Sequence, residues 1–337
     1  MRADILIVGQ GLAGTLLAWE FERAGISFAI ADPGRTDGAS HIAAGMINPV
    51  TGQRFVKSWR IDSLLPAARA TYREMEAGLG QPLWHEMRVR RLFADDRERR
   101  IAFEKYARGE LSPCVTREPD NTGFWIEQAG RVDLPALLPA AHARWQQRGW
   151  LKREIVSLEA ELEKFPLVID CTGAAGARGN GRESKFGFVP WEFSKGEMLA
   201  LEVDGLEAGV IVNRGNWMLP VGPRAAWVGA THEPKFGNLD PSAAGRAMLE
   251  ASAQALLGRP FSVTGHHAGV RVNLPDKRPL AGRHPADPRL GIVNGLGAKG
   301  ALWAPMLARQ WVNHLTEGVP FDPAIDVARF AGLSRIT

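Results

Sequence analysis

The stretch DILIVGQGLAGTLLAWEFERAGISFAIAD, residues 4–32, decides the fold of this chain. Residues 4–8 form a short apolar run that ends at a glycine, which predicts a buried strand. Residues 11–24 are rich in helix formers, and Gly25 is placed to end that helix because glycine adopts the left-handed backbone of a helix terminus. Residues 26–32 are a second apolar run. The stretch therefore predicts a β-α-β unit, which implies a parallel sheet with right-handed crossovers.

The turn between the first strand and the helix contains Gly9, Gly11 and Gly14 in the pattern G-x-G-x-x-G. Glycines at these positions permit a tight turn, a close approach of the backbone to a pyrophosphate, and close packing of helix against strand. The second strand ends at Asp32, whose carboxylate can bind both hydroxyls of an adenosine ribose and would repel the 2′-phosphate of NADP. We interpret the stretch as a dinucleotide site rather than a merely structural turn. The motif leaves the choice between FAD and NAD open.

Segments with the same strand-to-glycine or helical patterns recur along the chain. Helices are predicted over 62–79, 134–149, 241–257 and 301–315. Strands are predicted in several parts of 186–232, at 291–295, and within 165–176, where the strand runs into a glycine turn. Residues 80–130 are mixed, with short strand-like runs. We therefore predict an α/β fold, α+β overall, with a Rossmann-like domain and an inserted, mainly antiparallel sheet domain. The predicted segments are 1–78, 130–184 and 266–337 for the first domain, and 79–129 and 185–265 for the second.

Composition excludes several classes of protein. The 337 residues are 45% hydrophobic, which is globular, and the formal net charge is +4 with a pI near 9.3. Lysines and arginines are spread along the chain, so we favour attraction for small anions over a nucleic-acid surface. Only two cysteines are present, which argues against a disulfide framework or a cysteine-rich metal site, and no metal is predicted. No signal peptide or membrane span is evident, so the expected location is the cytoplasm.

Five blocks of sequence, taken together, resemble one known superfamily. They are VGQGLAG with Asp32, SHIAAGM at 40–46, VIDCTGA at 168–174, WMLPV followed by VGAT at 217–231, and AGVRVNLPDKRPLAGRHP running on to VNGLGAKGALWAP at 268–305. In this order they resemble the D-amino-acid oxidase superfamily of FAD enzymes. Within it, the chain is most similar to glycine oxidase and sarcosine-oxidase-like members. The combination is specific for the superfamily and says little about the substrate.

The resemblance implies that the dinucleotide is FAD and that the first domain is an FAD-binding domain. The cofactor-binding residues that it implies are Gly9, Gly11, Leu12, Ala13, Gly14, Asp32, Pro33, Ser40, His41, Ala43, Ala44, Gly45, Met46, Val156, Thr172, Gly173, Gly295, Gly297, Ala298, Lys299 and Gly300. Gly295 to Gly300 would present backbone N–H groups to the flavin pyrimidine at the start of the last helix. Non-covalent binding is expected, because no cysteine lies in the C-terminal region and His41 is one position before the histidine that some relatives use.

The resemblance also implies a substrate site. Arg271 occupies the position that binds the substrate carboxylate in amino-acid-oxidising members, where a guanidinium can bind both oxygens. Met46, Trp217 and Lys299 are further candidates for contact with the substrate or the flavin. Glycine oxidase-like proteins have a tyrosine where Trp217 stands, and sarcosine-oxidase relatives have an oxygen-activating lysine where Trp227 stands. These departures leave oxidase and dehydrogenase activity as alternatives.

The expected function is FAD-dependent oxidation of a C–N bond of a small amino acid or N-substituted amino acid. A hydride would pass from the α-carbon to flavin N5, the imine would hydrolyse, and O2 or a redox partner would accept the electrons. One alternative is a flavin-dependent step on a larger substrate, such as a modified base of tRNA. Arg54, Lys57 and Arg60 in the basic stretch 51–60 would suit such an anion, although a solvated loop is the plainer interpretation. The other alternative is a flavin-binding subunit without turnover of its own. Oligomers are possible.

Overall fold

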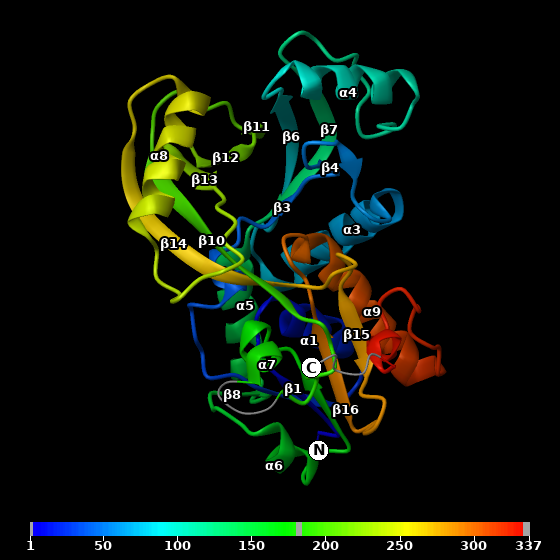
Figure 1. The fold of residues 1–337 in the computed structure, drawn as a ribbon. Helices are drawn as coiled ribbons and strands as arrows, with labels where there is room; N and C mark the ends of the chain where they lie inside the picture. Colours follow the sequence, from blue (N-terminus) through cyan, green and yellow to red (C-terminus); the bar gives the residue numbers. More distant parts are fainter. Residues whose placement is uncertain (1–2, 180–183, 333–337) are drawn as a thin grey trace.

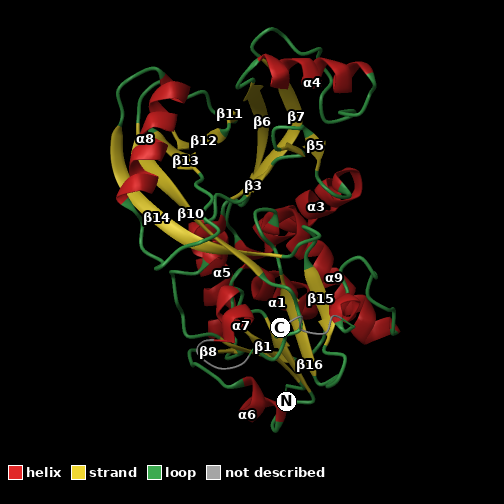
Figure 2. Ribbon diagram, viewed as in Figure 1, coloured by secondary structure: helices red, strands yellow, loops and turns green. Residues whose placement is uncertain are grey.

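The computed structural model describes residues 3–179 and 184–332, so the parts of the predicted domain segments at 1–2, 180–183 and 333–337 lie outside the described residues. The chain forms two halves, each built on one sheet, with the six-stranded sheet in the half that contains both termini (Figure 1). A curved eight-stranded sheet forms the other half, and long strands β10 and β14 run from one half into the other (Figure 2).

The six-stranded sheet contains the β-α-β unit predicted from the first 32 residues. Its strands, in spatial order, are β15 (Leu280–Arg283), β16 (Leu290–Asn294), β9 (Leu167–Asp170), β1 (Ile5–Val8), β2 (Phe28–Ala31) and β8 (Leu151–Lys152). All neighbours are parallel except β15 and β16. Both faces of β1 are buried: Ile5 and Ile7 join one core cluster, while Leu6 and Val8 join another. Burial on both faces explains why the strand reads as a continuous apolar run.

Helices cover one face of this sheet. They are α1 (Leu12–Arg23), α3 (Ile61–Leu79), α5 (Leu134–Gln147) and α9 (Gly300–Glu317), which pack on one another in the largest core cluster. The other face is covered by the second core cluster, which includes the short helix η2 (Val327–Phe330). The short helices α6 (Leu158–Leu162) and α7 (Ala174–Arg178) flank β9 in the chain. The parallel sheet is thus sandwiched between two apolar layers, as doubly wound folds require.

The eight-stranded sheet is mainly antiparallel. Its spatial order is β14 (Ser262–Asn273), β10 (Glu192–Glu202), β13 (Ala225–Gly229), β12 (Asn216–Gly222), β11 (Val210–Arg214), β6 (Trp84–Leu92), β7 (Gly123–Val132) and β3 (Met46–Ile47). Only β11 and β6 pair in parallel. Helix α8 (Ala243–Leu257) covers the outer face of β10, β12 and β13 (Figure 1). The predicted fold class is confirmed.

One helix in the mixed region 80–130 was not predicted from the sequence. Helix α4 (Asp96–Ala107) lies beyond the ends of β6 and β7, and only Glu98 and Ala102 of its residues are buried. Its apolar periodicity is weak because it packs little apolar surface, so the period-3.6 signal fails. The cap was readable, since the Asp95 carboxylate accepts a hydrogen bond from the backbone N–H of Glu98, three residues later.

The predicted domain segments stay a prediction, and several elements lie across their limits. Strand β7 crosses the limit at 129/130, and β14 crosses the limit at 265/266. Strand β3 pairs with β7 in the eight-stranded sheet, although it lies within segment 1–78. The remaining short elements are α2 (Ala39–Ile42) and the hairpin of β4 (Val50–Thr51) and β5 (Val56–Lys57).

Candidate active site and cofactor cradle

The glycine loop after β1 has the geometry that its sequence predicts. Gly9 has a φ of 96°, and a Cβ there would lie 2.8 Å from the carbonyl oxygen of Cys171. A Cβ on Gly14 would lie 1.9 Å from the carbonyl oxygen of Gly9, so helix α1 can approach the loop only because residue 14 has no side chain. Gly11 caps α1 without a side-chain hydrogen bond, which leaves the helix N-terminus facing the loop. This arrangement provides the N–H groups and the dipole that favour a pyrophosphate.

Asp32 lies at the end of β2, beside this loop. Its carboxylate accepts hydrogen bonds from the backbone N–H groups of Gln10 and Gly34, both at 2.7 Å. The predicted residue Ser40 lies on the other side, where its Oγ accepts a hydrogen bond from the N–H of Leu12 at 3.0 Å. The residue after β2 and the helix α2 (Ala39–Ile42) therefore meet at the start of α1.

The side chain of Gln10 indicates what the loop is built to hold. It is only 5% exposed, and neither its amide nitrogen nor its amide oxygen has a hydrogen-bond partner within the described part of the chain. Buried amides normally find partners, because an unpaired one costs free energy. A dinucleotide in the glycine loop would bring ribose and phosphate oxygens to this amide. The residues therefore fit the predicted cofactor, and Gln10 is a candidate cofactor-site residue that motif reasoning missed because position 10 carries no constraint in G-x-G-x-x-G.

The second glycine turn lies next to the first, after β9. Gly173 has a φ of 62°, and a Cβ there would meet nothing within 4 Å, so the turn borders open space. Its carbonyl oxygen accepts a hydrogen bond at 2.9 Å from Asn294, a buried residue at the end of β16. Thr172 bonds the buried carboxylate of Asp170 through both its N–H and its hydroxyl. The turn is thus rigidly held at the same edge of the sheet as the glycine loop. Asn294 was not predicted from the sequence.

The predicted ribityl-chain and adenine residues lie around this edge. Gly45 has a φ of 67° and approaches β7 so closely that a Cβ would lie 1.9 Å from the carbonyl oxygen of Val132. His41 is half-buried, and burial lowers its pKa, although the charges of Asp32 and Asp37 oppose this effect. The side chain of Val156 packs on the second core cluster. Their contacts with FAD stay a prediction.

The loop before α9 connects the cofactor edge to the strand that carries Arg271. The N–H of Gly297 donates to the carbonyl oxygen of Val272, the next residue after Arg271, at 2.9 Å. A Cβ on Gly297 would lie 2.3 Å from the amide oxygen of Asn273, so only glycine permits this contact. Lys299 follows in the same loop, and burial lowers its pKa. The structure thus brings the predicted flavin loop and the predicted substrate arginine together.

Arg271 is a largely buried cation without a carboxylate partner. Its Nη1 donates to the carbonyl oxygen of Thr231 at 3.1 Å, and it forms no ion pair within residues 3–179 and 184–332. Burial lowers its pKa, because removal from water disfavours the charged form. The guanidinium lies over Gly196 of β10, where a Cβ would come within 2.2–2.4 Å of its atoms. A buried, unneutralised guanidinium is a strong site for an external anion.

Trp217 lies on the same face of the sheet as Arg271. Arg271 of β14 lies opposite Ser194 of β10. Met198, four residues further along β10, lies opposite Gly229 of β13. Gly229 in turn lies opposite Trp217 of β12. Because side chains alternate along strands, this register places both side chains on the face opposite α8. The Trp217 ring covers Gly229, where a Cβ would lie 2.6 Å from it. Two glycines of this face therefore make room for the arginine and the tryptophan.

An open cavity of about 410 Å³ lies beside this face. It brings together the predicted residues Met46, Trp217, Ala298 and Lys299, and its remaining lining includes Asn48, Arg91, Asn213 and Leu302. Arg271 does not line this cavity. The charge of Arg91 is neutralised by Glu98, because Nη2 of Arg91 donates to both carboxylate oxygens of Glu98. The described lining contains no aspartate, glutamate or histidine, so it offers no general base.

The basic stretch 51–60 divides between two roles. Thr51, Gly52 and Gln53 line the cavity, while Lys57 pairs with Asp62 and Arg60 pairs with Asp322. The lysines and arginines of the stretch therefore do not all converge on one anion site.

Trp227, the second tryptophan singled out above, lies under the guanidinium of Arg131, whose Cζ is 5.4 Å from the ring centroid.

A glycine loop suited to a dinucleotide, together with a curved antiparallel sheet that carries a buried arginine, is the arrangement expected of an FAD-dependent oxidoreductase. Residues 4–313 match the family described as FAD dependent oxidoreductase, and the chain belongs to this family. It is therefore an FAD-dependent oxidoreductase, and the prediction of FAD is confirmed. No helix in the described part of the chain is long and apolar enough to cross a membrane, and the same residues contain no cluster of three or more metal-ligating His, Cys, Asp or Glu side chains.

Individual relatives differ in what their names say. The chain is 31% identical to the tRNA 5-methylaminomethyl-2-thiouridine biosynthesis bifunctional protein MnmC of Maricaulis maris (strain MCS10), over 94% of this chain and 52% of that protein. The chain thus spans about half the length of this curated relative. Among solved structures, glycine oxidase from Geobacillus kaustophilus matches with a TM-score of 0.79 and 22% identity, covering 100% of this chain and 99% of that one. Iminodiacetate oxidase from Chelativorans sp. BNC1 matches with a TM-score of 0.77 and 20% identity, covering 95% of this chain and 98% of that one. These two structures share the fold.

A Gly14→Ala substitution tests the cradle. Because the new Cβ would lie 1.9 Å from the carbonyl oxygen of Gly9, helix α1 must move away from the loop, and we expect at least a tenfold loss of FAD affinity. The measurement is the FAD content of purified protein and the Kd for FAD added to stripped protein. Gly222→Ala is the matched control, since its Cβ would meet only Ala225 at an ordinary 3.5 Å. Equal FAD affinity in the two variants would contradict the cradle.

Proposed function

We propose that this protein oxidises a C–N bond of an amino acid or N-substituted amino acid whose carboxylate binds Arg271. The observation that carries the proposal is the buried, unpaired guanidinium of Arg271, one residue from the contact between β14 and the predicted flavin loop. A guanidinium in this setting binds both oxygens of a carboxylate and fixes the position of the carbon attached to it.

FAD would be held by the glycine loop, Asp32, Gln10, the second glycine turn and the loop before α9. When bound, FAD supplies the acceptor for the two electrons of an amine oxidation. The residues of the chain supply binding and orientation. Arg271 would hold the carboxylate, and the Trp217 ring would form a wall on the same sheet face. Met46 and Lys299 would border the cavity that Trp217 also lines.

The charges around the cavity restrict the form of the substrate. Lys299 has a lowered pKa because of burial, and the described cavity lining provides no carboxylate to receive a proton. We infer that the amine binds in its neutral form, since the site offers cations for the carboxylate and nothing negative for an ammonium. Water would then hydrolyse the imine to a carbonyl compound and a free amine. The electron acceptor, O2 or a redox partner, stays open.

The test is the visible spectrum of the purified protein, recorded anaerobically before and after addition of glycine, sarcosine, iminodiacetate and other small amino acids. Flavin bands that bleach with one carboxylate-bearing amine, and not with the matching amine that lacks the carboxylate, are the expected result. Bands that persist with every small amine contradict the proposal as stated. They would favour either a larger substrate or a flavin-binding subunit without turnover of its own.

A second candidate function is a flavin-dependent step on a larger substrate, such as a modified base of tRNA. One observation favours it: the 31% identity to a protein whose name places it in tRNA thiouridine biosynthesis. The cavity is open. Arg54, in the turn between β4 and β5, and Arg214, the last residue of β11, are next in sequence to residues that line it, and neither has an ion-pair partner among the described residues. Binding of tRNA that weakens steeply between low and physiological salt would support this candidate.

A further inference from the structure

The carboxylate site at Arg271 depends on groups that do not touch a substrate. We propose that Gly196 and Thr231 are positioning residues for Arg271, and that a buried polar cluster on the opposite face of the sheet fixes the Thr231 carbonyl in place. The inference rests on the proposed function, in which Arg271 binds a carboxylate.

Gly196 provides the space that the guanidinium occupies. A Cβ at this position would lie 2.2 Å from Nη1, 2.3 Å from Nη2 and 2.4 Å from Cζ of Arg271. All three atoms belong to the planar group that would bind the carboxylate, so a methyl group at residue 196 must displace the fork itself. The backbone of Gly196 does not require glycine, since its φ lies outside the left-handed region. The absence of a side chain here is therefore explained by the arginine.

Thr231 provides the hydrogen bond that orients the guanidinium. Its carbonyl oxygen accepts from Nη1 at 3.1 Å, which is the hydrogen bond that Arg271 makes with its side chain in the described structure. The carbonyl uses one N–H of the fork and leaves the others for a ligand. Removal of this acceptor would let the long side chain adopt other rotamers, because burial alone does not select one direction.

Thr231 is tied to β10 by two further hydrogen bonds. Its N–H donates to the carbonyl oxygen of Glu197 at 3.1 Å, and its hydroxyl accepts from the N–H of Glu197 at 2.8 Å. Glu197 directly follows Gly196, so consecutive residues of one strand face opposite sides of the sheet. Gly196 opens the space on the substrate side, and Glu197 anchors Thr231 from the other.

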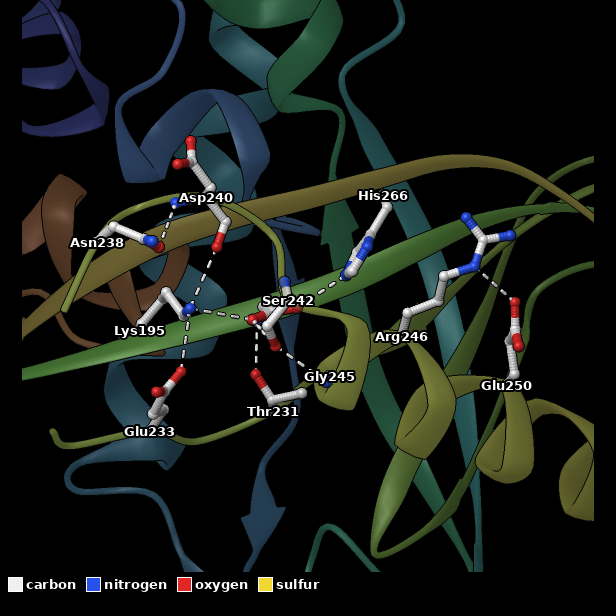
Figure 3. A network of polar contacts seen from close by, with 11 residues as sticks. Lys195, Thr231, Glu233, Asn238, Asp240, Ser242, Gly245, Arg246, Glu250 and His266 are labelled. Atoms are coloured by element: carbon white, nitrogen blue, oxygen red, sulfur yellow. Dashed lines mark hydrogen bonds and ion pairs between the residues drawn. The ribbon is translucent and has the colours of Figure 1, made fainter. Parts of the chain in front are cut away.

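Glu197 is the centre of the buried polar cluster, which we define as Lys195, Glu197, Thr231, Ser242 and His266. Figure 3 labels the other four residues of the cluster. The Glu197 carboxylate, 1% exposed, accepts from Ser242 N–H at 3.0 Å and Ser242 Oγ at 2.9 Å, and contacts His266 Nε2 at 2.8 Å. Lys195 Nζ lies 3.2 Å from it and 3.1 Å from Glu233. The cluster joins β10, β14, the segment after β13 and the start of α8, and so fixes the strand residue, Glu197, whose backbone binds Thr231.

The experiment measures binding of acetate, which carries the carboxylate without an amine, to the FAD-loaded protein through the flavin difference spectrum, with acetamide as the neutral control. We expect Gly196→Ala to raise the acetate Kd about tenfold or more, since displacement of a binding group by about 1 Å has effects of this size. Gly222→Ala, on strand β12 of the same sheet with no close contact, should leave the Kd within about twofold.

Thr231 offers a second, milder pair of variants. Thr231→Val removes the hydroxyl and should raise the acetate Kd by about threefold to tenfold, the usual value of one hydrogen bond, while Thr231→Ser should restore it. A purely structural role would lower the Tm of Thr231→Val without changing the Kd of the remaining folded protein for acetate.

Arg271→Ala separates the two proposals. If Arg271→Ala abolishes acetate binding while Gly196→Ala and Thr231→Val bind acetate like the wild type, the positioning inference is wrong and the proposed carboxylate site stands. If Arg271→Ala binds acetate like the wild type, or if the wild type binds no acetate, both the proposed carboxylate site and the positioning inference are wrong. Weakened binding in all three variants, with the serine and Gly222 controls unchanged, is the result that the structure predicts.

Discussion

Replacement of Arg271 by alanine should lower kcat/KM for a carboxylate-bearing amine by roughly a thousandfold, which corresponds to about 4 kcal/mol, the value of two charge-assisted hydrogen bonds. The reason is the setting of the guanidinium: it is largely buried, it lies over Gly196, and no carboxylate within the described chain neutralises it. The carboxylate of a bound substrate would supply the negative partner that the guanidinium lacks in the described chain. Most of the loss should appear in KM if the arginine only binds the carboxylate, and in kcat as well if it also orients the reacting carbon.

The measurement is steady-state kinetics with the best amine from the anaerobic screen, together with the FAD content of each variant. Arg246→Ala is a matched control, because that arginine is exposed on α8 and pairs only with Glu250. Unchanged kinetics in Arg271→Ala with full FAD content would remove the main support for the proposed function. The charge is restored but the planar fork is not in Arg271→Lys, so we expect only partial recovery.

Replacement of Glu197 by leucine should lower the free energy of unfolding by about 3–5 kcal/mol, as expected when one partner of a buried ion pair is removed. The variant would leave Lys195, with a side chain 4% exposed, beside Glu233 alone, and would leave the N–H of Ser242 without its acceptor. The carboxylate holds the start of α8, and the backbone of the same residue holds Thr231, so we expect the loss to extend to the proposed carboxylate site at Arg271.

The control for this prediction is Glu202→Leu, on the same strand, where the glutamate is exposed and pairs with exposed Arg224. Such a surface pair is worth about 1 kcal/mol or less. Denaturant unfolding at several pH values supplies a second readout. Burial raises the pKa of Glu197, but hydrogen bonds from Ser242 and the charge of Lys195 outweigh burial and lower it overall. The stabilisation is therefore present above the usual carboxyl pKa and is lost as pH falls through the lowered pKa, so the difference between wild type and variant should shrink in acid.

The cofactor cradle was predictable because its requirements are local. A tight turn, a pyrophosphate at a helix N-terminus and an acid at the end of the next strand are all encoded within residues 4–32, and the structure places Gly9, Gly14 and Asp32 accordingly. Gln10 and Asn294 escaped prediction for the opposite reason. The role of Gln10 follows from burial without a partner, and that of Asn294 from a hydrogen bond to Gly173, more than a hundred residues away in sequence.

Helix α4 could not be predicted from apolar periodicity. The helix buries two of its residues, so no apolar stripe marks it, and only the cap at Asp95 distinguishes it from a loop. The long strands β6 and β7 were read as short runs for a related reason: β7 alternates imperfectly because the pairing shifts between Met87 and Val89. A bulge switches which face of the sheet the following side chains point to. In the sequence, one long strand then looks like two short ones.

The sequence by itself determined the parallel sheet, the dinucleotide loop and the presence of an arginine candidate for a carboxylate, because strand length, glycine spacing and residue type act over a few neighbours. Only the tertiary structure decided that Arg271 is unneutralised in the described chain, that Gly196 makes room for it, and that the carbonyl of Thr231, bonded to the backbone of Glu197, accepts its hydrogen bond. Those facts depend on which strands pair and in what register. Register is set by packing of whole faces, to which residues far apart in the chain contribute together.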